Sequence, residues 1–328
     1  MTLDLERLLS RLPGPDTAAT AAVTERAQRV LRPTGAFARL DEIAAWLAGW
    51  QCRDNPRVER PACVVFVGDH GVTTNGVSAY PAAITAAMLR ALREGVATAS
   101  VLARNLGAEI SVVDVGVGRP TGDLSVEAAL SLERFEACFL EGRAAVRSLD
   151  ADLLVIGEMG IGNTTAAAAT CAALFGRTAE DWTGRGTGVD EPTYARKVAA
   201  VRRAVDRVRD LAPVEVMREV GGSELAAMAG AVVEARLRSL PILLDGFVVT
   251  AAVAALDVMA PGALDHCLAA HVSSEPGHRL LLEKLGKQPL LDLDLRLGEG
   301  TGALMALPLI GLACAAVTDV ATFEEWGI

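Results

Sequence analysis

Aromatic residues and positive charges are both scarce in this sequence. Phe, Trp and Tyr make up 4% of the 328 residues, and 31 Lys and Arg stand against 41 Asp and Glu, for a formal net charge of −10. Nucleic-acid binding calls for a basic surface or for aromatic platforms on which bases stack. We therefore expect no nucleic-acid partner. The length of the chain is enough to bury a sizeable core.

Cysteine and histidine are also sparse, and neither forms a metal-binding pattern. The six cysteines are scattered, several of them in apolar runs where cysteine behaves as a small buried hydrophobe. The four histidines form no HxH or HExxH pattern. We expect no metal, no cofactor and a reduced, cytoplasmic setting.

Long hydrophobic segments are missing as well. The N-terminus shows no basic segment leading into an apolar one, so we expect no signal peptide. The longest apolar stretch, residues 303–317, is shorter than the roughly 20 residues of a membrane span and is interrupted by Pro308. We expect no membrane span.

From residue 62 onward, short apolar runs alternate with helical patterns. The runs are predicted strands, and they cover residues 64–67, 110–115, 153–156, 240–244 and 267–272. Helices are predicted between them, including 86–102 and 224–237, the latter capped by Ser223, and residues 291–297 alternate as an extended segment. This order predicts an α/β fold with a doubly wound, mainly parallel sheet, Rossmann-like and three-layered. Ligands bind at the carboxyl ends of such strands.

The first 60 residues follow a different pattern. Residues 17–31 are Ala-rich after Asp16, and residues 40–50 place Trp46 and Trp50 on one apolar helical face. No strand intervenes, so we predict a helical lobe, 1–60, joined by the C-terminal helix, about 303–328, beside an α/β domain, 61–302. The two tryptophans are interpreted as packing residues rather than ligand-stacking ones.

The stretch after the third predicted strand carries the strongest functional signal. Gly157, Gly160 and Gly162 are followed by residues that start helices well, beginning with Asn163. A helix entered this way presents unpaired N–H groups to an anion. The spacing of these three glycines, GxxGxG, differs from the dinucleotide-binding and P-loop fingerprints. Glu158 is out of place in a purely structural turn or an anion site, and predicts a carboxylate held for chemistry.

A second glycine-rich helix entrance, Gly298-Glu-Gly-Thr-Gly302, places Glu299 in a matching context. A carboxylate enclosed by glycine backbone and apolar side chains has a raised pKa and becomes a competent general base. In the flexible loop 183–188, Arg185 is either a phosphate clamp or a surface residue. Lys197 lies on a helix of mostly solvated charges and is the one most able to reach a phosphate. His70 is expected to orient a turn.

Eight motifs together resemble the nicotinate-nucleotide:dimethylbenzimidazole phosphoribosyltransferase family. In chain order they are GDHGV (68–72), GVSAYP (76–81), GEMGIGNTT (157–165), TGRGTG (183–188), GGSELAAMAG (221–230), LLDGFV (243–248), HVSSEPGH (271–278) and LRLGEGTGA (295–303).

The resemblance implies a homodimer with a small helical lobe from both chain ends. It also implies transfer of phosphoribose from nicotinate mononucleotide to a ring nitrogen of dimethylbenzimidazole, in cobalamin lower-ligand synthesis. Glu299 would be the general base, and Glu158 would stabilise positive charge near the ribose. The implied substrate-binding residues are Gly160, Ile161, Gly162, Asn163, Thr164, Arg185, Gly186, Lys197, Asp245, Ser273, Ser78, Tyr80, Gly298 and Gly300.

The chain departs from the family pattern at residues 32–38, at Ala82 and within 120–147. The accepted base is therefore open between dimethylbenzimidazole and another benzimidazole or a phenol. A non-catalytic nucleotide-binding protein is the alternative of a different class, since it would keep the glycine loop without needing paired glutamates.

Overall fold

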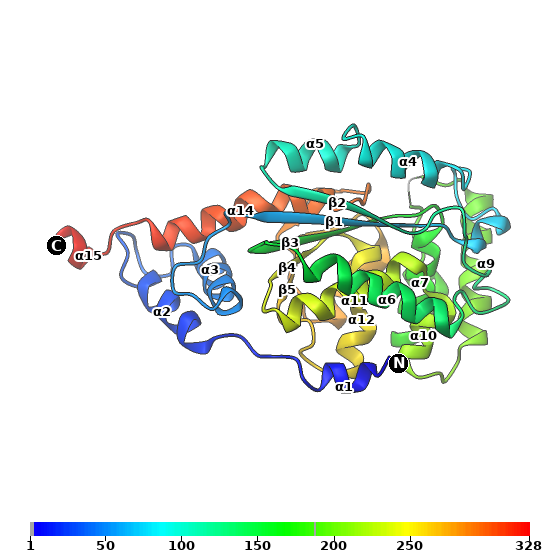
Figure 1. Ribbon diagram of the computed structural model, residues 1–328, viewed down its shortest axis with the longest axis horizontal. Coiled ribbons are helices and arrows are strands. Elements are labelled where there is room, and N and C mark those ends of the chain that lie inside the picture. Colours follow the sequence, from blue (N-terminus) through cyan, green and yellow to red (C-terminus); the bar gives the residue numbers. More distant parts are fainter. Residues whose placement is uncertain (1–2, 187) are drawn as a thin grey trace.

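The chain forms a parallel sheet covered on both faces by helices, with a helical extension at one end (Figure 1). A computed structural model describes residues 3–186 and 188–328. The five strands of the sheet lie in the order β2-β1-β3-β4-β5, all parallel. They are β1 (Pro61–Gly68), β2 (Glu109–Gly116), β3 (Leu153–Met159), β4 (Ile242–Leu244) and β5 (Cys267–Ala269). This confirms the predicted doubly wound α/β class.

Alternate residues of the central strands feed two separate cores. In β1, Val64 and Phe66 belong to one core, whereas Val65 and Val67 belong to the other, and every residue of the strand is buried. A strand covered on both faces must be apolar throughout, which explains the unbroken apolar runs of the sequence.

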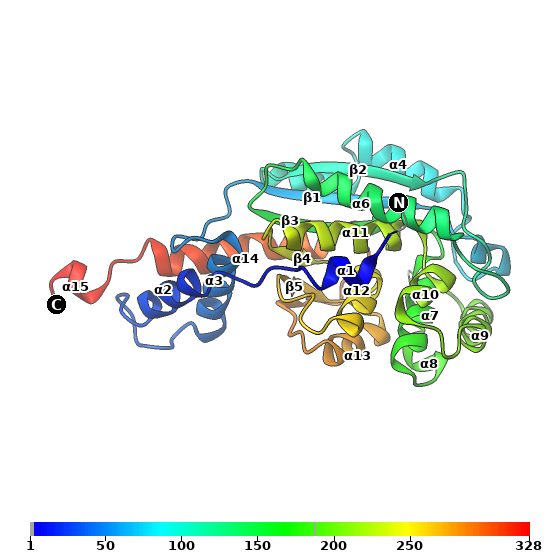
Figure 2. The ribbon, with the colours of Figure 1, turned by 60° about the horizontal axis from the view of Figure 1, so that its bottom comes forward.

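One face of the sheet packs against the larger group of helices. Its inner helices are α6 (Leu132–Arg147), α7 (Asn163–Phe175), α11 (Ser223–Leu237) and α12 (Phe247–Met259). Around these lie α1 (Leu5–Leu9), α8 (Ala179–Trp182), α9 (Glu191–Arg207), α10 (Pro213–Val220) and α13 (Pro276–Lys284), as Figure 2 shows.

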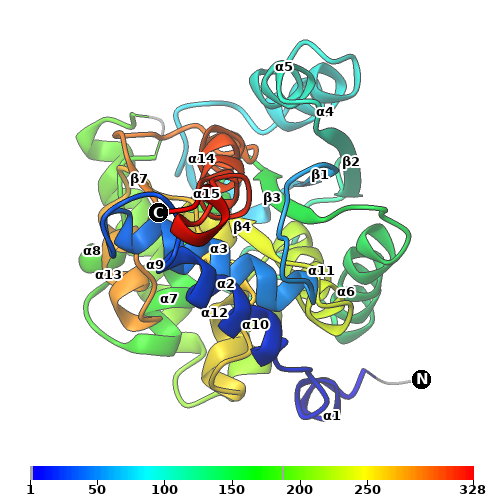
Figure 3. The ribbon, with the colours of Figure 1, turned by 90° about the vertical axis from the view of Figure 1, so that its left-hand side faces the viewer.

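The other face packs against α4 (Ile84–Arg93), α5 (Thr98–Asn105) and α14 (Thr301–Thr318), with α3 (Ala38–Gln51) beside them. The far half of α14 extends beyond the sheet, where it meets α2 (Thr17–Ala27) and α3, and α15 (Phe323–Trp326) ends the chain there (Figures 1 and 3). In contrast, α1 lies against α12 and buries Leu5 and Leu9 in the main core.

Several local predictions are wrong. Residues 86–102 form two helices, because the chain turns at Gly95, whose φ is +76°. Residues 267–272 divide between β5 and β6 (His271–Val272), which pairs with β7 (Leu291–Asp292) in a second sheet. Only the start of the extended segment 291–297 is therefore a strand.

Three helix details also differ from expectation. The helix predicted over 17–31 ends at Ala27. Gly222, not Ser223, is the N-cap of α11, because the Ser223 hydroxyl instead accepts a hydrogen bond from Arg134 at 2.9 Å. Pro308 does not interrupt α14, which runs on through it.

By length and composition α14 could cross a membrane, with a mean hydropathy of 1.9, but 56% of it is buried inside the protein. With that share of its residues buried, α14 is a core helix. The tryptophans of α3 pack as predicted: Trp50 is buried with its ring edge against His266, and the Trp46 indole donates to the Asp265 carbonyl at 2.9 Å.

Candidate active site

A cavity of about 400 Å³ lies at the carboxyl ends of the strands. The strand order reverses between β1 and β3, so the loops that follow these two strands diverge and leave a crevice. Twelve predicted site residues line this cavity: Ser78, Tyr80, Glu158, Gly160, Ile161, Gly162, Asn163, Thr164, Gly186, Ser273, Gly298 and Glu299. Arg185, Lys197, Asp245 and Gly300 are not among the lining residues.

The loop after β3 orients Glu158. Gly162, with a φ of +95°, is the N-cap of α7, so that Asn163 begins the helix as predicted. The Asn163 side-chain amide donates to the Glu158 carboxylate. The Ile161 N–H is already used, because it donates to the Thr85 hydroxyl at 3.2 Å. The Asn163 side chain therefore orients the Glu158 carboxylate.

Glu299 occupies a strained backbone position. Its φ of +60° is uncommon for a residue with a side chain, and it lies between Gly298 and Gly300, which also have positive φ. Asp245, which is almost fully buried, holds this loop by accepting hydrogen bonds from the N–H groups of Gly300 (3.2 Å) and Ala303 (2.9 Å). Asp245 is thus placed behind the cavity, at the start of α14.

The two glutamate loops interlock. The Glu299 N–H donates to the Glu158 carbonyl at 3.1 Å. A Cβ added to Gly157 would lie 2.4 Å from the carbonyl carbon of Glu299, and one added to Gly298 would lie 2.6 Å from Oε1 of Glu158. The close approach therefore requires glycine at Gly157, where the clash is with backbone atoms, and the φ of +89° favours glycine at Gly298.

Both carboxyl groups hold their protons more tightly than usual. Burial, followed by the negative charges of Asp245 and Glu224, raises the pKa of Glu158 well above its ordinary value of 4.5, and the Asn163 hydrogen bond opposes this. Burial also raises the pKa of Glu299, against the opposing effect of the Ala99 N–H. A positively charged ligand in the cavity would oppose both shifts, because it favours the ionised carboxylates.

A buried ammonium group lies beside the cavity, on the side of α9. The Lys197 side chain is buried, and its ammonium donates to the Thr164 hydroxyl at 2.9 Å and to the Gly184 carbonyl at 3.0 Å. Burial lowers the pKa of Lys197, while the charge of Glu275 opposes the shift. Lys197 is therefore not on a solvated face. It supports Thr164 and the loop at Gly184 from behind.

The Arg185 side chain has other partners than Lys197 does. Its guanidinium pairs with Glu191, donates to the Val189 carbonyl at 3.2 Å and lies over the Tyr194 ring. The surface alternative for Arg185 describes the structure better than the phosphate clamp. Thr187, in the same motif, lies outside the described residues.

Ser273 is held by a neutral histidine. Its N–H donates to Nδ1 of His278 at 2.9 Å, so Nε2 carries the ring proton and faces the Thr250 hydroxyl at 3.2 Å. Burial lowers the pKa of His278 to about 3. Ser273 is thereby fixed at the cavity wall.

The sequence prediction missed several lining residues. Apolar side chains from four separate segments form much of the wall, namely Ile84, Met88, Met159, Phe247, Val248 and Leu297. Glu275 accepts the Gly186 N–H at 2.7 Å, and His271 and Arg296 complete the polar part. Glu275 carried a signal, since it precedes a proline at a helix start beyond a strand. The apolar residues carried none that separates wall from core.

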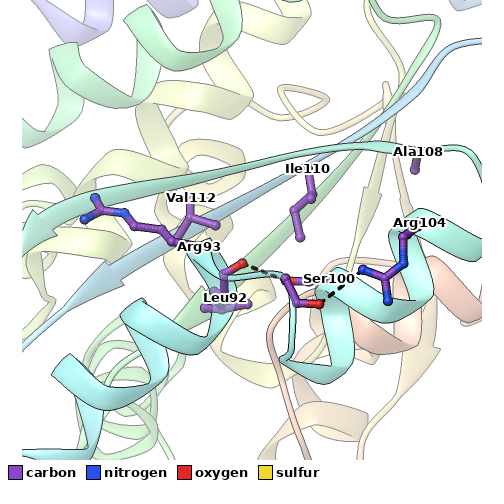
Figure 4. Close-up of a pocket in the computed structure, with 8 residues that line it drawn as sticks. Leu92, Arg93, Ser100, Arg104, Ala108, Ile110 and Val112 are labelled. Atoms are coloured by element: carbon purple, nitrogen blue, oxygen red, sulfur yellow. Dashed lines mark hydrogen bonds between the residues drawn. The ribbon is translucent and has the colours of Figure 1, made fainter.

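A second cavity, of about 470 Å³, lies on the outer face of β2 between α4 and α5 (Figure 4). Its polar side chains mainly join the two helices: the Ser100 hydroxyl donates to the Leu92 carbonyl at 2.9 Å, and Arg104 donates to the Gly95 carbonyl at 3.2 Å. Its floor is apolar, formed by Ala108, Ile110 and Val112. The glutamate cavity is therefore the candidate active site.

Fold and cavity together define an α/β protein with a small-molecule site at its topological switch point. A family model described as phosphoribosyltransferase matches residues 12–328, so the chain belongs to this phosphoribosyltransferase family.

Similar proteins extend the match over nearly the whole chain. Nicotinate-nucleotide–dimethylbenzimidazole phosphoribosyltransferases of Sinorhizobium medicae (strain WSM419) and Brucella anthropi (strain ATCC 49188) are 49% and 46% identical to it; each alignment covers 99% of this chain and 96% of the relative. The crystal structure of CobT from Thermus thermophilus superposes with a TM-score of 0.91 at 44% identity, covering 95% of this chain and 99% of that one.

Proposed function

We infer that this enzyme transfers phosphoribose from nicotinate mononucleotide to dimethylbenzimidazole, yielding α-ribazole phosphate and nicotinate, in cobalamin lower-ligand synthesis. Full-length similarity to enzymes of that name supports the reaction. The observation that carries it is the pair of buried glutamates, Glu158 and Glu299, on interlocked loops around one cavity.

The donor suits the charge of this cavity. Its ring nitrogen is a pyridinium, so the glycosidic bond breaks with the electron pair going to the ring, and nicotinate leaves without needing a proton there. The ribose gains oxocarbenium character as the bond lengthens. A carboxylate aimed at the sugar stabilises that charge, and we assign this role to Glu158. The cationic donor favours the ionised form of Glu158 and so opposes the effect of burial, which raises the pKa of this carboxyl group.

Glu299 is proposed as the general base. One benzimidazole nitrogen uses its lone pair to form the bond to the anomeric carbon, and the proton on the other nitrogen passes to the carboxylate. The raised pKa of Glu299 brings it closer to the working pH, which is where a base is most effective. Attack opposite the departing ring inverts the anomeric carbon and gives the α product.

The phosphate is proposed to lie against Gly160–Thr164 and Gly186, with Lys197 behind them. The N-terminus of α7 and the buried ammonium both favour an anion there. The acceptor would then contact the apolar wall that includes Ile84, Met88 and Leu297. We also propose that Ser273, Ser78, Tyr80, Gly298 and Gly300 shape the substrate contacts.

The test is a product analysis. Nicotinate mononucleotide and dimethylbenzimidazole are incubated with the protein, and ribazole phosphate and free nicotinate are expected in equal amounts. Parallel reactions with other benzimidazoles and with phenols rank the accepted base. Binding of the mononucleotide without any product from this panel would favour the non-catalytic alternative.

We further propose a cytoplasmic homodimer built from an α/β domain (61–302) and a helical lobe (1–60 with about 303–328), although α1 and the first half of α14 pack onto the core of the α/β domain. In support, α14 and the chain end expose a series of apolar side chains: Met305 (44% exposed), Leu312 (65%), Phe323 (42%), Trp326 (68%) and Ile328 (77%). Apolar surface gathered in this way is typical of an interface. A second copy of the chain, meeting its own lobe across a two-fold axis, would cover it.

A further inference from the structure

A buried acid–histidine pair lies beside the active site without a role in the chemistry above. His70 follows β1, and Glu224 is in the first turn of α11. Nε2 of His70 and Oε1 of Glu224 are 2.5 Å apart, and both side chains are fully buried. The second carboxylate oxygen and the second ring nitrogen have no hydrogen-bond partner in the described residues.

The pair is in direct contact with the glycine loop. A Cβ added to Gly160 would lie 2.6 Å from the Gly68 carbonyl oxygen, 3.1 Å from Oε1 of Glu224 and 3.3 Å from Cδ2 of His70. A Cβ on Gly162 would lie 3.4 Å from Cβ of His70. The Gly68 carbonyl oxygen is what most strongly bars a methyl group at Gly160, as Cγ2 of Thr73 does at 2.9 Å for Gly162, and the side chains of His70 and Glu224 fill the remaining space directly beneath the loop.

Glu224 also acts on Glu158 through its charge. The carboxylates that face Glu158 are Asp245 after β4, Glu224 from α11 and Glu299 before α14, and all three raise its pKa, against the Asn163 amide from α7. Glu275, His271 and Arg296 line the same cavity. Among these neighbours Glu224 is the carboxylate that lies beneath the glycine loop, outside the lining.

We propose that His70 and Glu224 form a positioning pair for the transfer reaction: the imidazole supports Gly160–Gly162 beneath the nucleotide, and the Glu224 charge, behind Glu158, favours a cationic pyridinium donor. This inference rests on the proposed function. A plain structural strut would supply the support alone, without the electrostatic effect on the donor.

The decisive variant is Glu224→Gln, which keeps the shape and an oxygen acceptor for His70 but removes the charge. We expect the KM for nicotinate mononucleotide to rise about tenfold, the effect of one charge interaction at the effective dielectric of a protein. The acid limb of kcat/KM, to which Glu158 contributes, should move to lower pH by about one unit.

Glu234→Gln is the matched control. Glu234 is on the same helix and is also buried, but it pairs with Arg143 and Arg147, away from the cavity. It should lower the melting temperature while KM and the pH profile stay as in the wild type. If Glu224→Gln behaves like this control, the pair is only a strut and the inference is overturned.

His70→Gln separates support from charge, and it decides the case should Glu224→Gln not fold. It keeps a donor for Glu224 but removes the ring under Gly160, so KM for the mononucleotide should rise with the acid limb unmoved. A wild-type KM in this variant would refute the positioning role. Wild-type turnover is the reference: its absence would refute the proposed function itself, whereas normal turnover with unaltered variants refutes only the pair.

Discussion

The backbone N–H of Glu299 donates a hydrogen bond of 3.1 Å to the carbonyl oxygen of Glu158. This bond ties the entrance of α14 to the end of β3, so that two carboxylates from distant parts of the chain share one cavity. The distance between the two loops is set by backbone atoms. It therefore does not depend on side-chain rotamers.

Glu299→Gln should abolish most of the turnover while leaving the mononucleotide bound. The amide cannot accept the benzimidazole proton, and a general base contributes about 10²–10⁴-fold. Steady-state rates and calorimetric titration with nicotinate mononucleotide test this. Wild-type activity in the variant would remove Glu299 from the role of base.

Gly157→Ala should separate the two glutamates. The new methyl group would lie 2.4 Å from the carbonyl carbon of Glu299 and from the Gly300 nitrogen, and neither can rotate away. We expect a loss of about 1–3 kcal/mol in the free energy of unfolding and a fall in kcat of about 10²-fold.

The control for Gly157→Ala is Gly311→Ala on α14, where an added Cβ meets nothing within 4 Å. Alanine there should stabilise the helix by up to about 1 kcal/mol and leave kcat unchanged. Denaturant melts and initial rates measure both variants. Equal behaviour of the two alanines would show that the close approach at Gly157 has no importance.

Glu158→Gln should make the protein more stable at neutral and alkaline pH. The pKa of Glu158 is raised above 4.5, so the folded state binds more protons than the unfolded state as pH rises past 4.5. The free energy of unfolding falls in that window, and glutamine removes the loss. We expect a melting temperature about 2–4 °C above wild type at pH 8, the effect of about 1 kcal/mol, and no difference near pH 4. If the melting temperatures of the variant and the wild type differ by the same amount at every pH in this range, the raised pKa of Glu158 is contradicted.

His278→Gln should weaken the dependence of stability on acid. The folded state keeps His278 neutral, with a pKa of about 3, whereas the unfolded chain takes up a proton near 6.5. The free energy of unfolding therefore falls as pH drops through this window. The variant should show a smaller fall between pH 6.5 and 4, measured by urea melts. Some fall must remain, because burial also lowers the pKa of His266 to about 3.

Leu312→Asp should produce monomers if the apolar face of α14 is the dimer interface. Leu312 is 65% exposed, and a charge there would be desolvated on association. Light scattering after gel filtration reports the mass. Leu211→Asp, on a different exposed segment, should leave the mass unchanged, and a dimeric Leu312→Asp protein would place the interface elsewhere.

The sequence alone determined the sheet and the glycine-rich helix entrances. Buried parallel strands must be apolar throughout and helices must alternate with them, so β1 and β3 were recognisable from composition. Gly162 and Asn163 marked the start of α7 because helix entry has its own local chemistry. Glu158 and Glu299 were conspicuous because one carboxylate at a helix entrance can simply stabilise the helix dipole, whereas two in matching glycine contexts favour chemistry.

Only the tertiary structure decided which residues meet. The strand order placed β1 beside β3, and so brought His70 and Glu224 under Gly160, an encounter that no local pattern encodes. It also turned Arg185, in the loop before α9, outward and buried Lys197 on α9, because the way these segments pack, not the composition of the charged face of α9, sets which cation points inward. Local chemistry fixes the conformation of each segment, whereas contacts between distant segments depend on how all of them pack at once.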